Sequence, residues 1–128
     1  ATRAFPPGAE DLPDEYRETG QPVIIGGSME TGSYVLVGCR GGAETFFSTA
    51  HGSGRVMSRA KARKQFHGKT LIQDLKQKGI YVQAASYSAL AEEAGGAYKD
   101  IDEVITSTER AGINTPVVRL IPIGNIKG

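Results

Sequence analysis

The chain has 128 residues, of which 39% are hydrophobic and 23% are charged, so it is long enough for one domain with an apolar core. Cys39 is the single cysteine, which excludes an internal disulfide. Nothing in the sequence resembles a signal peptide, and no run of about 18 apolar residues could span a membrane. The formal net charge of +1 gives no indication of a partner. We therefore expect a cytoplasmic protein without a membrane partner.

The first third of the chain predicts an arm followed by strands. The chain begins at Ala1 without a methionine, which suggests a piece of a longer polypeptide. Residues 6–20 are rich in proline, glycine and acidic residues, and they predict an irregular arm with a helical turn at 14–17. Strands are expected over 22–25 and 33–38, the second apolar enough to be buried on both faces. Residues 44–49 are expected to return in an extended conformation.

The rest of the chain alternates between helical and extended patterns. Helices are expected over 57–66, 69–78, 88–94 and 99–111, and strands over 80–84 and 116–121. This order predicts an α/β fold, in which a mixed sheet with flanking helices forms one unit over residues 1–128.

Two loops of small residues follow the predicted strands and could form two walls of one site. One comprises Gly26, Gly27, Ser28 and Met29, and the other runs from His51 through Gly52 and Ser53 to Gly54. Glycines let a backbone approach a ligand closely, and backbone N–H groups in a turn can bind an anion. His51 could accept a phosphoryl group there. Two ordinary turns remain the alternative, because glycine-rich loops discriminate weakly.

A basic segment begins at His51. Residues 51–78 hold eight basic residues and one acidic residue, whereas residues 1–50 hold three basic and seven acidic. Arg55, Arg59 and Arg63 are spaced four apart, so a helix would place them on one face. A solvated charged face is the usual meaning of such a run, but its one-sidedness favours a nucleic-acid contact.

Metal and hydrolase sites have little support in the sequence. His51 and His67 are the only histidines and, with one cysteine, offer no metal-ligand spacing, so no metal site is expected within this chain. The G-x-S-x-G motif of serine hydrolases is missing. A hydrolase is therefore only a weak competitor.

The whole chain resembles, in order, the C-terminal part of the RtcB-type RNA ligases. The matching segments are residues 1–7 (ATRAFPP), 20–23 (GQPV), 27–29 (GSM), 33–36 (SYVL), 44–46 (ETF), 48–55 (STAHGSGR), 58–62 (SRAKA), 79–82 (GIYV), 92–94 (EEA), 97–99 (AYK), 111–113 (AGI), 119–124 (RLIPIG) and 127–128 (KG). The resemblance implies the C-terminal portion of that fold. It also implies the family's reaction, in which RNA 3′-phosphate or 2′,3′-cyclic phosphate ends are joined to 5′-hydroxyl ends with GTP and Mn²⁺, in tRNA splicing or RNA repair.

The resemblance also implies roles for individual residues. His51 matches the histidine that becomes guanylylated. The implied nucleotide contacts are Gly26, Gly27, Ser28, Met29 and Ser33, the backbone of Gly52, Ser53 and Gly54, and, against the guanine, Tyr98 and Lys127. Arg55, Arg59 and Arg63 would face RNA.

Two departures from the family pattern stand out, because Glu30 and Phe47 occupy positions where glycine is usual. The manganese ligands of the family lie upstream of residue 1, so we expect this chain to need an N-terminal portion and to ligate little or not at all alone. A non-catalytic RNA- or nucleotide-binding module remains the alternative. A third possibility is a fragment that misfolds or assembles through exposed core.

Overall fold

A computed structural model describes residues 1–127, in which short strands alternate with helices. The strands are β1 (Thr2–Arg3), β2 (Pro22–Gly26), β3 (Ser33–Gly38), β4 (Ser48–Thr49), β5 (Tyr81–Ala84), β6 (Asn114–Leu120) and β7 (Gly124–Lys127). The α-helices are α1 (Arg59–Gln65), α2 (Gly68–Gln77), α3 (Tyr87–Glu92) and α4 (Ile101–Arg110), and the 3₁₀ helices are η1 (Asp14–Tyr16), η2 (Arg40–Thr45) and η3 (Gly95–Ala97).

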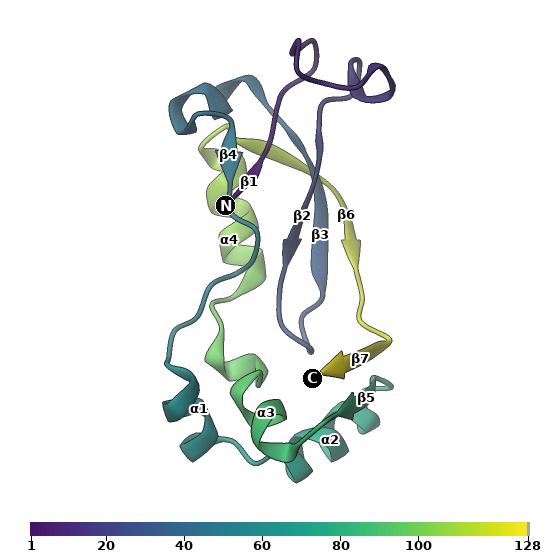
Figure 1. Ribbon diagram of the computed structural model, residues 1–128, viewed down its shortest axis with the longest axis vertical. Coiled ribbons are helices and arrows are strands. Elements are labelled where there is room, and N and C mark those ends of the chain that lie inside the picture. The colour runs from purple at the N-terminus through teal and green to yellow at the C-terminus, as the bar shows by residue number, and fades with distance from the viewer. Residues whose placement is uncertain (128) are drawn as a thin grey trace.

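The strands form three small sheets. Strands β2, β3 and β6 form an antiparallel sheet in that order. Strand β1 pairs with β4, also antiparallel, and β5 pairs with β7 in parallel. Helix α4 runs beside the three-stranded sheet, whereas α1, α2 and α3 gather near the turn between β2 and β3 (Figure 1). The α/β fold with mixed strand directions and flanking helices is confirmed, although the strands do not form one continuous sheet.

Two apolar clusters hold these parts together. In the first, Ile101 and Ile105 of α4 pack against the sheet; its buried members are Ala4, Val23, Ile25, Leu36, Ile101 and Ile105. The second lies between α2, α3 and β5; its buried members are Met29, Leu71, Leu75, Ile80, Leu90 and Ala94. Met29 comes from the turn after β2, so this turn is anchored in the helical cluster.

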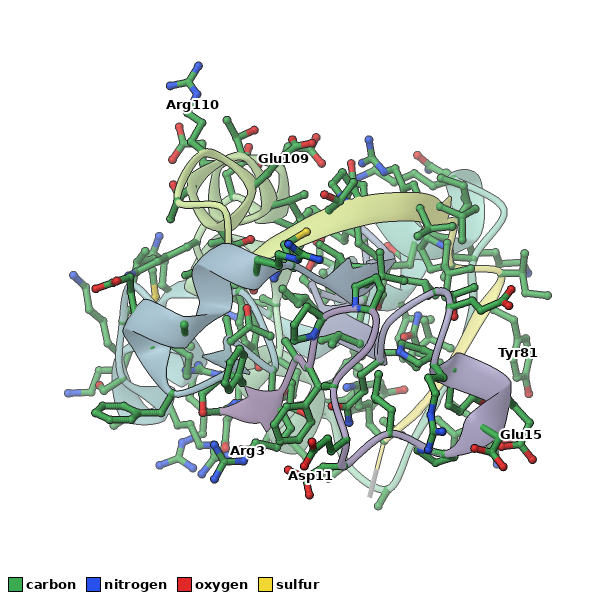
Figure 2. The ribbon with its side chains drawn as sticks, turned by 90° about the horizontal axis from the view of Figure 1, so that it is seen from above. Arg3, Asp11, Glu15, Tyr81, Glu109 and Arg110 are labelled. Atoms are coloured by element: carbon green, nitrogen blue, oxygen red, sulfur yellow. The ribbon has the colours of Figure 1, made fainter. Side chains whose placement is uncertain are left out.

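Helix ends follow the local capping chemistry. The Ser58 hydroxyl accepts a hydrogen bond from the N–H of Lys61, which starts α1 at Arg59 rather than at Met57. The Asp100 carboxylate accepts from the N–H of Asp102 and thereby starts α4. At the other end of α4, Glu109 and Arg110 extend away from the sheets (Figure 2). The four predicted helices are therefore confirmed: α1, α3 and α4 are shorter than predicted, and α2 has the predicted length but begins and ends one residue earlier.

The return towards His51 was predicted wrongly. Instead of an extended segment from residue 44, the chain forms η2 and only then the two-residue strand β4. Phe46 and Phe47 connect the two with positive φ angles of 54° and 51°. The Phe47 ring packs on Phe5, with ring centroids 5.5 Å apart. A left-handed backbone at residue 47 explains why glycine is usual at this position in the resemblance.

The interpretation of β3 as buried on both faces was also wrong. Leu36 and Gly38 are buried, but the other residues of the strand are half-buried. On the neighbouring strands Ile24 is 61% exposed and Val118 is 47% exposed. Strand β7 was not predicted; it forms because its backbone pairs with β5, from the partners Tyr81 and Gly124 onwards.

Candidate functional site

The turn after β2 is closed by its own polar groups. The N–H of Gly27 donates to the carbonyl oxygen of Gly32 at 2.9 Å, and the N–H of Ser28 donates to Thr31 Oγ1 at 2.9 Å. The Ser28 hydroxyl in turn accepts from the N–H of Glu30 at 3.2 Å. A Cβ at Gly27 would lie 2.2 Å from the Gly32 oxygen. Only glycine therefore fits at position 27, and the turn is preorganised.

The His51 segment lies directly beside this turn. The N–H of Gly26 donates to the His51 carbonyl oxygen at 3.2 Å, and the N–H of Ser53 donates to the Gly26 carbonyl oxygen at 2.8 Å. Ser33 is the register partner of Gly26 on β3. The two loops that the sequence predicts as neighbours thus share backbone hydrogen bonds.

On its other side the same segment pairs with the chain around Tyr98. The N–H of Lys99 donates to the Gly54 carbonyl oxygen at 2.9 Å, and the N–H of Val56 donates to the Ala97 carbonyl oxygen at 2.9 Å. Gly54 has a φ of +76°, which turns the chain between its two partners. The His51 segment therefore connects the sheet to the helical part of the molecule.

His51 is exposed, so its imidazole ring can be reached from solvent. In a neutral imidazole one ring nitrogen carries the proton and the other has a free lone pair, and the tautomer decides which.

The hydroxyl of Ser53 is buried without a partner among residues 1–127. The residue is 4% exposed. A buried hydroxyl without a hydrogen bond is costly, and a polar ligand beside it would satisfy it. Ser53 lies two residues from His51, so this unsatisfied hydroxyl is close to that histidine in the chain.

Tyr98 and Lys127 are far apart in the sequence but share one carboxylate. The Tyr98 hydroxyl donates to Glu93 Oε2 at 2.5 Å, and the Lys127 Nζ lies 4.0 Å from the same oxygen. Burial and the hydrogen bond to Glu93 raise the pKa of the Tyr98 hydroxyl. The Asn125 side chain donates to the Met29 carbonyl oxygen at 3.3 Å, which ties β7 to the first loop. Sequence analysis gave no role to Glu93, although it lies in the matching segment 92–94, or to Asn125, because their contacts are with residues that are distant in the chain.

The three arginines lie in different surroundings. Arg59 and Arg63 are on α1 and both pair with the Glu92 carboxylate. Arg55 precedes the helix, and its guanidinium donates to the Glu92 carbonyl oxygen at 2.6 Å and to the Tyr98 hydroxyl at 2.9 Å. The predicted stripe of three arginines on one helix is wrong in this respect, because the Ser58 cap starts the helix after Arg55.

No three His, Cys, Asp or Glu side chains within residues 1–127 come together in a way that could hold a metal ion. None of the helices in the same residues is long and apolar enough to cross a membrane. Manganese chemistry therefore has no complete ligand set in the described residues.

The family model described as tRNA-splicing ligase RtcB matches residues 1–128. The chain belongs to the RtcB family. Relatives include the tRNA-splicing ligase RtcB of Pyrococcus furiosus at 56% identity and that of Archaeoglobus fulgidus at 54%, each over 129 aligned residues. The RNA-splicing ligase RtcB of Mycobacterium tuberculosis is 47% identical over 128 residues. Each alignment covers 100% of this chain, which spans 13%, 27% and 29% of these three relatives.

Proposed function

We propose that this chain supplies the guanylate acceptor of an RNA ligase, which joins RNA 3′-phosphate or 2′,3′-cyclic phosphate ends to 5′-hydroxyl ends in tRNA splicing or RNA repair. The observation that carries the proposal is the family match over residues 1–128, together with an exposed His51 hydrogen-bonded through its backbone to the Gly26 turn. The cytoplasm, where RNA is spliced and repaired and where a lone Cys39 stays reduced, is the location that we propose.

In this proposal GTP is the substrate of the first step. The lone pair of a neutral His51 ring nitrogen attacks the α-phosphorus, a P–N bond forms, and the bond to pyrophosphate breaks. The RNA 3′-phosphate then takes the guanylyl group from His51, and the 5′-hydroxyl of the second RNA end displaces GMP. Each step exchanges one bond to phosphorus for another, so no oxidant or reductant is needed.

We propose that the nucleotide lies across the two loops. The Gly26–Met29 turn and the backbone of residues 52–54 would lie against the phosphates. Several backbone N–H groups of these loops already donate within the chain, so the donor that we propose is the Ser53 hydroxyl, which has no partner among residues 1–127. Tyr98 and Lys127 would lie against the guanine. Support comes from the juxtaposition of these elements in space, since residues 26, 51, 98 and 127 are brought together by backbone pairing and by Glu93.

Manganese would be held by residues outside this chain. The residues described here form no ligand cluster, and the chain spans 13–29% of the three relatives compared above. Bound Mn²⁺ would neutralise the triphosphate charge. We therefore propose that the chain alone ligates little or no RNA, and that the upstream part of a family member completes the site.

The decisive experiment is intact-mass analysis after incubation with GTP and Mn²⁺. One tube contains the 128-residue chain, and a second contains the chain fused to the upstream part of the Archaeoglobus fulgidus relative. We expect a GMP adduct in the fusion that is lost in His51→Ala and kept in His67→Ala, which replaces the other histidine. An adduct that survives His51→Ala would contradict the acceptor role, and no adduct in either tube would favour the nucleotide- or RNA-binding module instead.

A further inference from the structure

Glu93 follows α3 directly and is the centre of a cluster of charged and polar groups. Its Oε2 accepts a hydrogen bond from the Tyr98 hydroxyl at 2.5 Å, and its Oε1 lies 3.6 Å from Arg55 Nη1. Lys127 Nζ lies 4.0 Å from Oε2. The Glu93 side chain is 26% exposed, so this carboxylate is partly shielded from water, and its interactions are less screened than those of a surface ion pair.

Arg55 fixes the other side of the Tyr98 ring. Its guanidinium lies 4.8 Å from the ring centroid and donates to the Tyr98 hydroxyl at 2.9 Å. Arg55 Nε also donates to the Met57 carbonyl oxygen at 3.1 Å. Since backbone carbonyls hold the guanidinium, Arg55 is a rigid support, and the Tyr98 hydroxyl lies between this cation and the Glu93 carboxylate.

Lys127 is held less tightly. It lies on β7, and its distance of 4.0 Å from Glu93 Oε2 is too long for a direct hydrogen bond. Its side chain is 34% exposed. The carboxylate therefore attracts the ammonium towards Tyr98. Within residues 1–127 its three N–H donors have no hydrogen-bond acceptor, so they can donate to an acceptor such as a nucleobase carbonyl oxygen.

We propose that Glu93 is the positioning residue of the nucleobase end of the site: it fixes the position of the Tyr98 hydroxyl and holds the Lys127 ammonium beside it. This inference rests on the proposed function, in which both side chains face guanine. Glu93 acts through these two residues and not at the phosphate, so its loss weakens nucleotide binding without slowing transfer to His51.

The test separates binding from chemistry in the fusion with the Archaeoglobus fulgidus upstream part. Guanylylation rates are measured against GTP concentration for the unsubstituted fusion, Glu93→Gln and Glu93→Ala. Because hydrogen bonds to charged groups are the stronger ones, we expect KM for GTP to rise about 3-fold in Glu93→Gln, which keeps an acceptor for Tyr98, and about 10-fold in Glu93→Ala. The rate at saturating GTP should stay within about 2-fold.

Glu92→Gln is the matched control, because Glu92 is the adjacent carboxylate and its side chain pairs with Arg59 and Arg63 instead. Its KM for GTP should not change in the absence of RNA. An equal rise of KM in Glu92→Gln, or a fall in the saturating rate with KM unchanged in Glu93→Gln, would overturn the positioning role.

A second measurement keeps this inference separate from the proposed chemistry. Equilibrium dialysis of GTP is carried out in the His51→Ala background, where no adduct can form on that residue. A weaker GTP affinity with Glu93→Gln in this background supports the inference even if the intact-mass experiment shows no acceptor role for His51. An unchanged affinity refutes it even if His51 is guanylylated, and a Glu93→Ala protein that does not fold leaves the Glu93→Gln result decisive.

Discussion

The backbone N–H of Ser53 donates to the carbonyl oxygen of Gly26 at 2.8 Å. With the bond from the Gly26 N–H to the His51 carbonyl oxygen, this contact fixes the His51 segment against the end of β2. A displacement of the turn after β2 is therefore transmitted to His51, and the two loops act as one unit.

Gly27→Ala should destabilise the chain by about 2 kcal/mol, because the added Cβ would lie 2.2 Å from the Gly32 carbonyl oxygen and the turn must open. Gly26→Ala is the control: the nearest atom to its Cβ is the His51 carbonyl oxygen at 3.9 Å, an ordinary contact. We expect it to change stability by less than about 0.5 kcal/mol. Urea unfolding of both variants measures the difference, and equal effects would contradict this account of the turn.

Ser53→Ala should leave the stability of the chain unchanged or raise it by about 1 kcal/mol, because it removes a buried hydroxyl that has no partner within residues 1–127. Affinity for GTP in the fusion should fall. Thr49→Val is the matched case of a satisfied hydroxyl, since Asn114 Nδ2 donates to Thr49 Oγ1 at 2.7 Å. It should cost about 1–3 kcal/mol. Thermal unfolding measures the stability of both variants, and its shift on adding GTP measures the affinity for GTP. A Ser53→Ala variant that is less stable than the unsubstituted chain would show that the hydroxyl has a partner.

Phe46→Asn should stabilise the chain by about 1 kcal/mol. Phe46 has φ 54° and ψ 40°, a left-handed conformation that asparagine tolerates better, and its side chain is 83% exposed. Phe47→Asn relieves the same strain but removes the packing against Phe5, so it should be destabilising by about 1 kcal/mol. Urea denaturation measures whether the two substitutions change the free energy of unfolding in opposite directions. A loss of stability in both variants would mean that Phe46 has packing partners in solution.

Stability should fall as the pH rises above about 10, in part because of Tyr98. Burial and the hydrogen bond to Glu93 raise the pKa of its hydroxyl in the folded chain, while the Arg55 guanidinium opposes this. The raised pKa stabilises the fold below the unfolded pKa, and this contribution is lost as the pH rises through the folded pKa. Tyr98→Phe should flatten the decline of unfolding free energy between about pH 9 and 11. Tyr81→Phe, at a 66% exposed residue, is the control that should not flatten it.

RNA affinity of the fusion should decrease with Arg59→Ala and with Arg63→Ala, and the slope of log affinity against log salt should become less steep by about 1 for each arginine that no longer binds a phosphate. Both side chains remain accessible on α1, at 68% and 47% exposure, although Glu92 pairs with them. Arg17→Ala removes an exposed arginine that pairs with Asp14 in the N-terminal arm, and it should have no effect on either quantity. Filter binding over a salt series measures the affinity and the slope. An unchanged slope in Arg59→Ala and Arg63→Ala would show that these two arginines do not bind RNA phosphates.

Local structure and family membership follow from the amino-acid sequence alone. Apolar periodicity predicts the helices, because it acts within a few residues along the chain. The cap at Asp100, which starts α4 at Ile101 and not at residue 99, is seen only in the structure. Local signals failed at residues 44–47, where positive φ angles at two phenylalanines run against the intrinsic preference of the residues. Only the wider fold can impose such a conformation.

Which distant residues meet depends on the folded chain. No periodicity in the sequence indicates that β7 pairs in parallel with β5, or that Glu93 joins Tyr98 to Arg55 and Lys127. Pairing between distant strands and ion pairs between distant residues depend on chain packing, in which each contact is made possible by many others. The sequence thus identified His51 as the acceptor to test, and the fold identified Glu93 as the residue that we propose positions Tyr98 and Lys127.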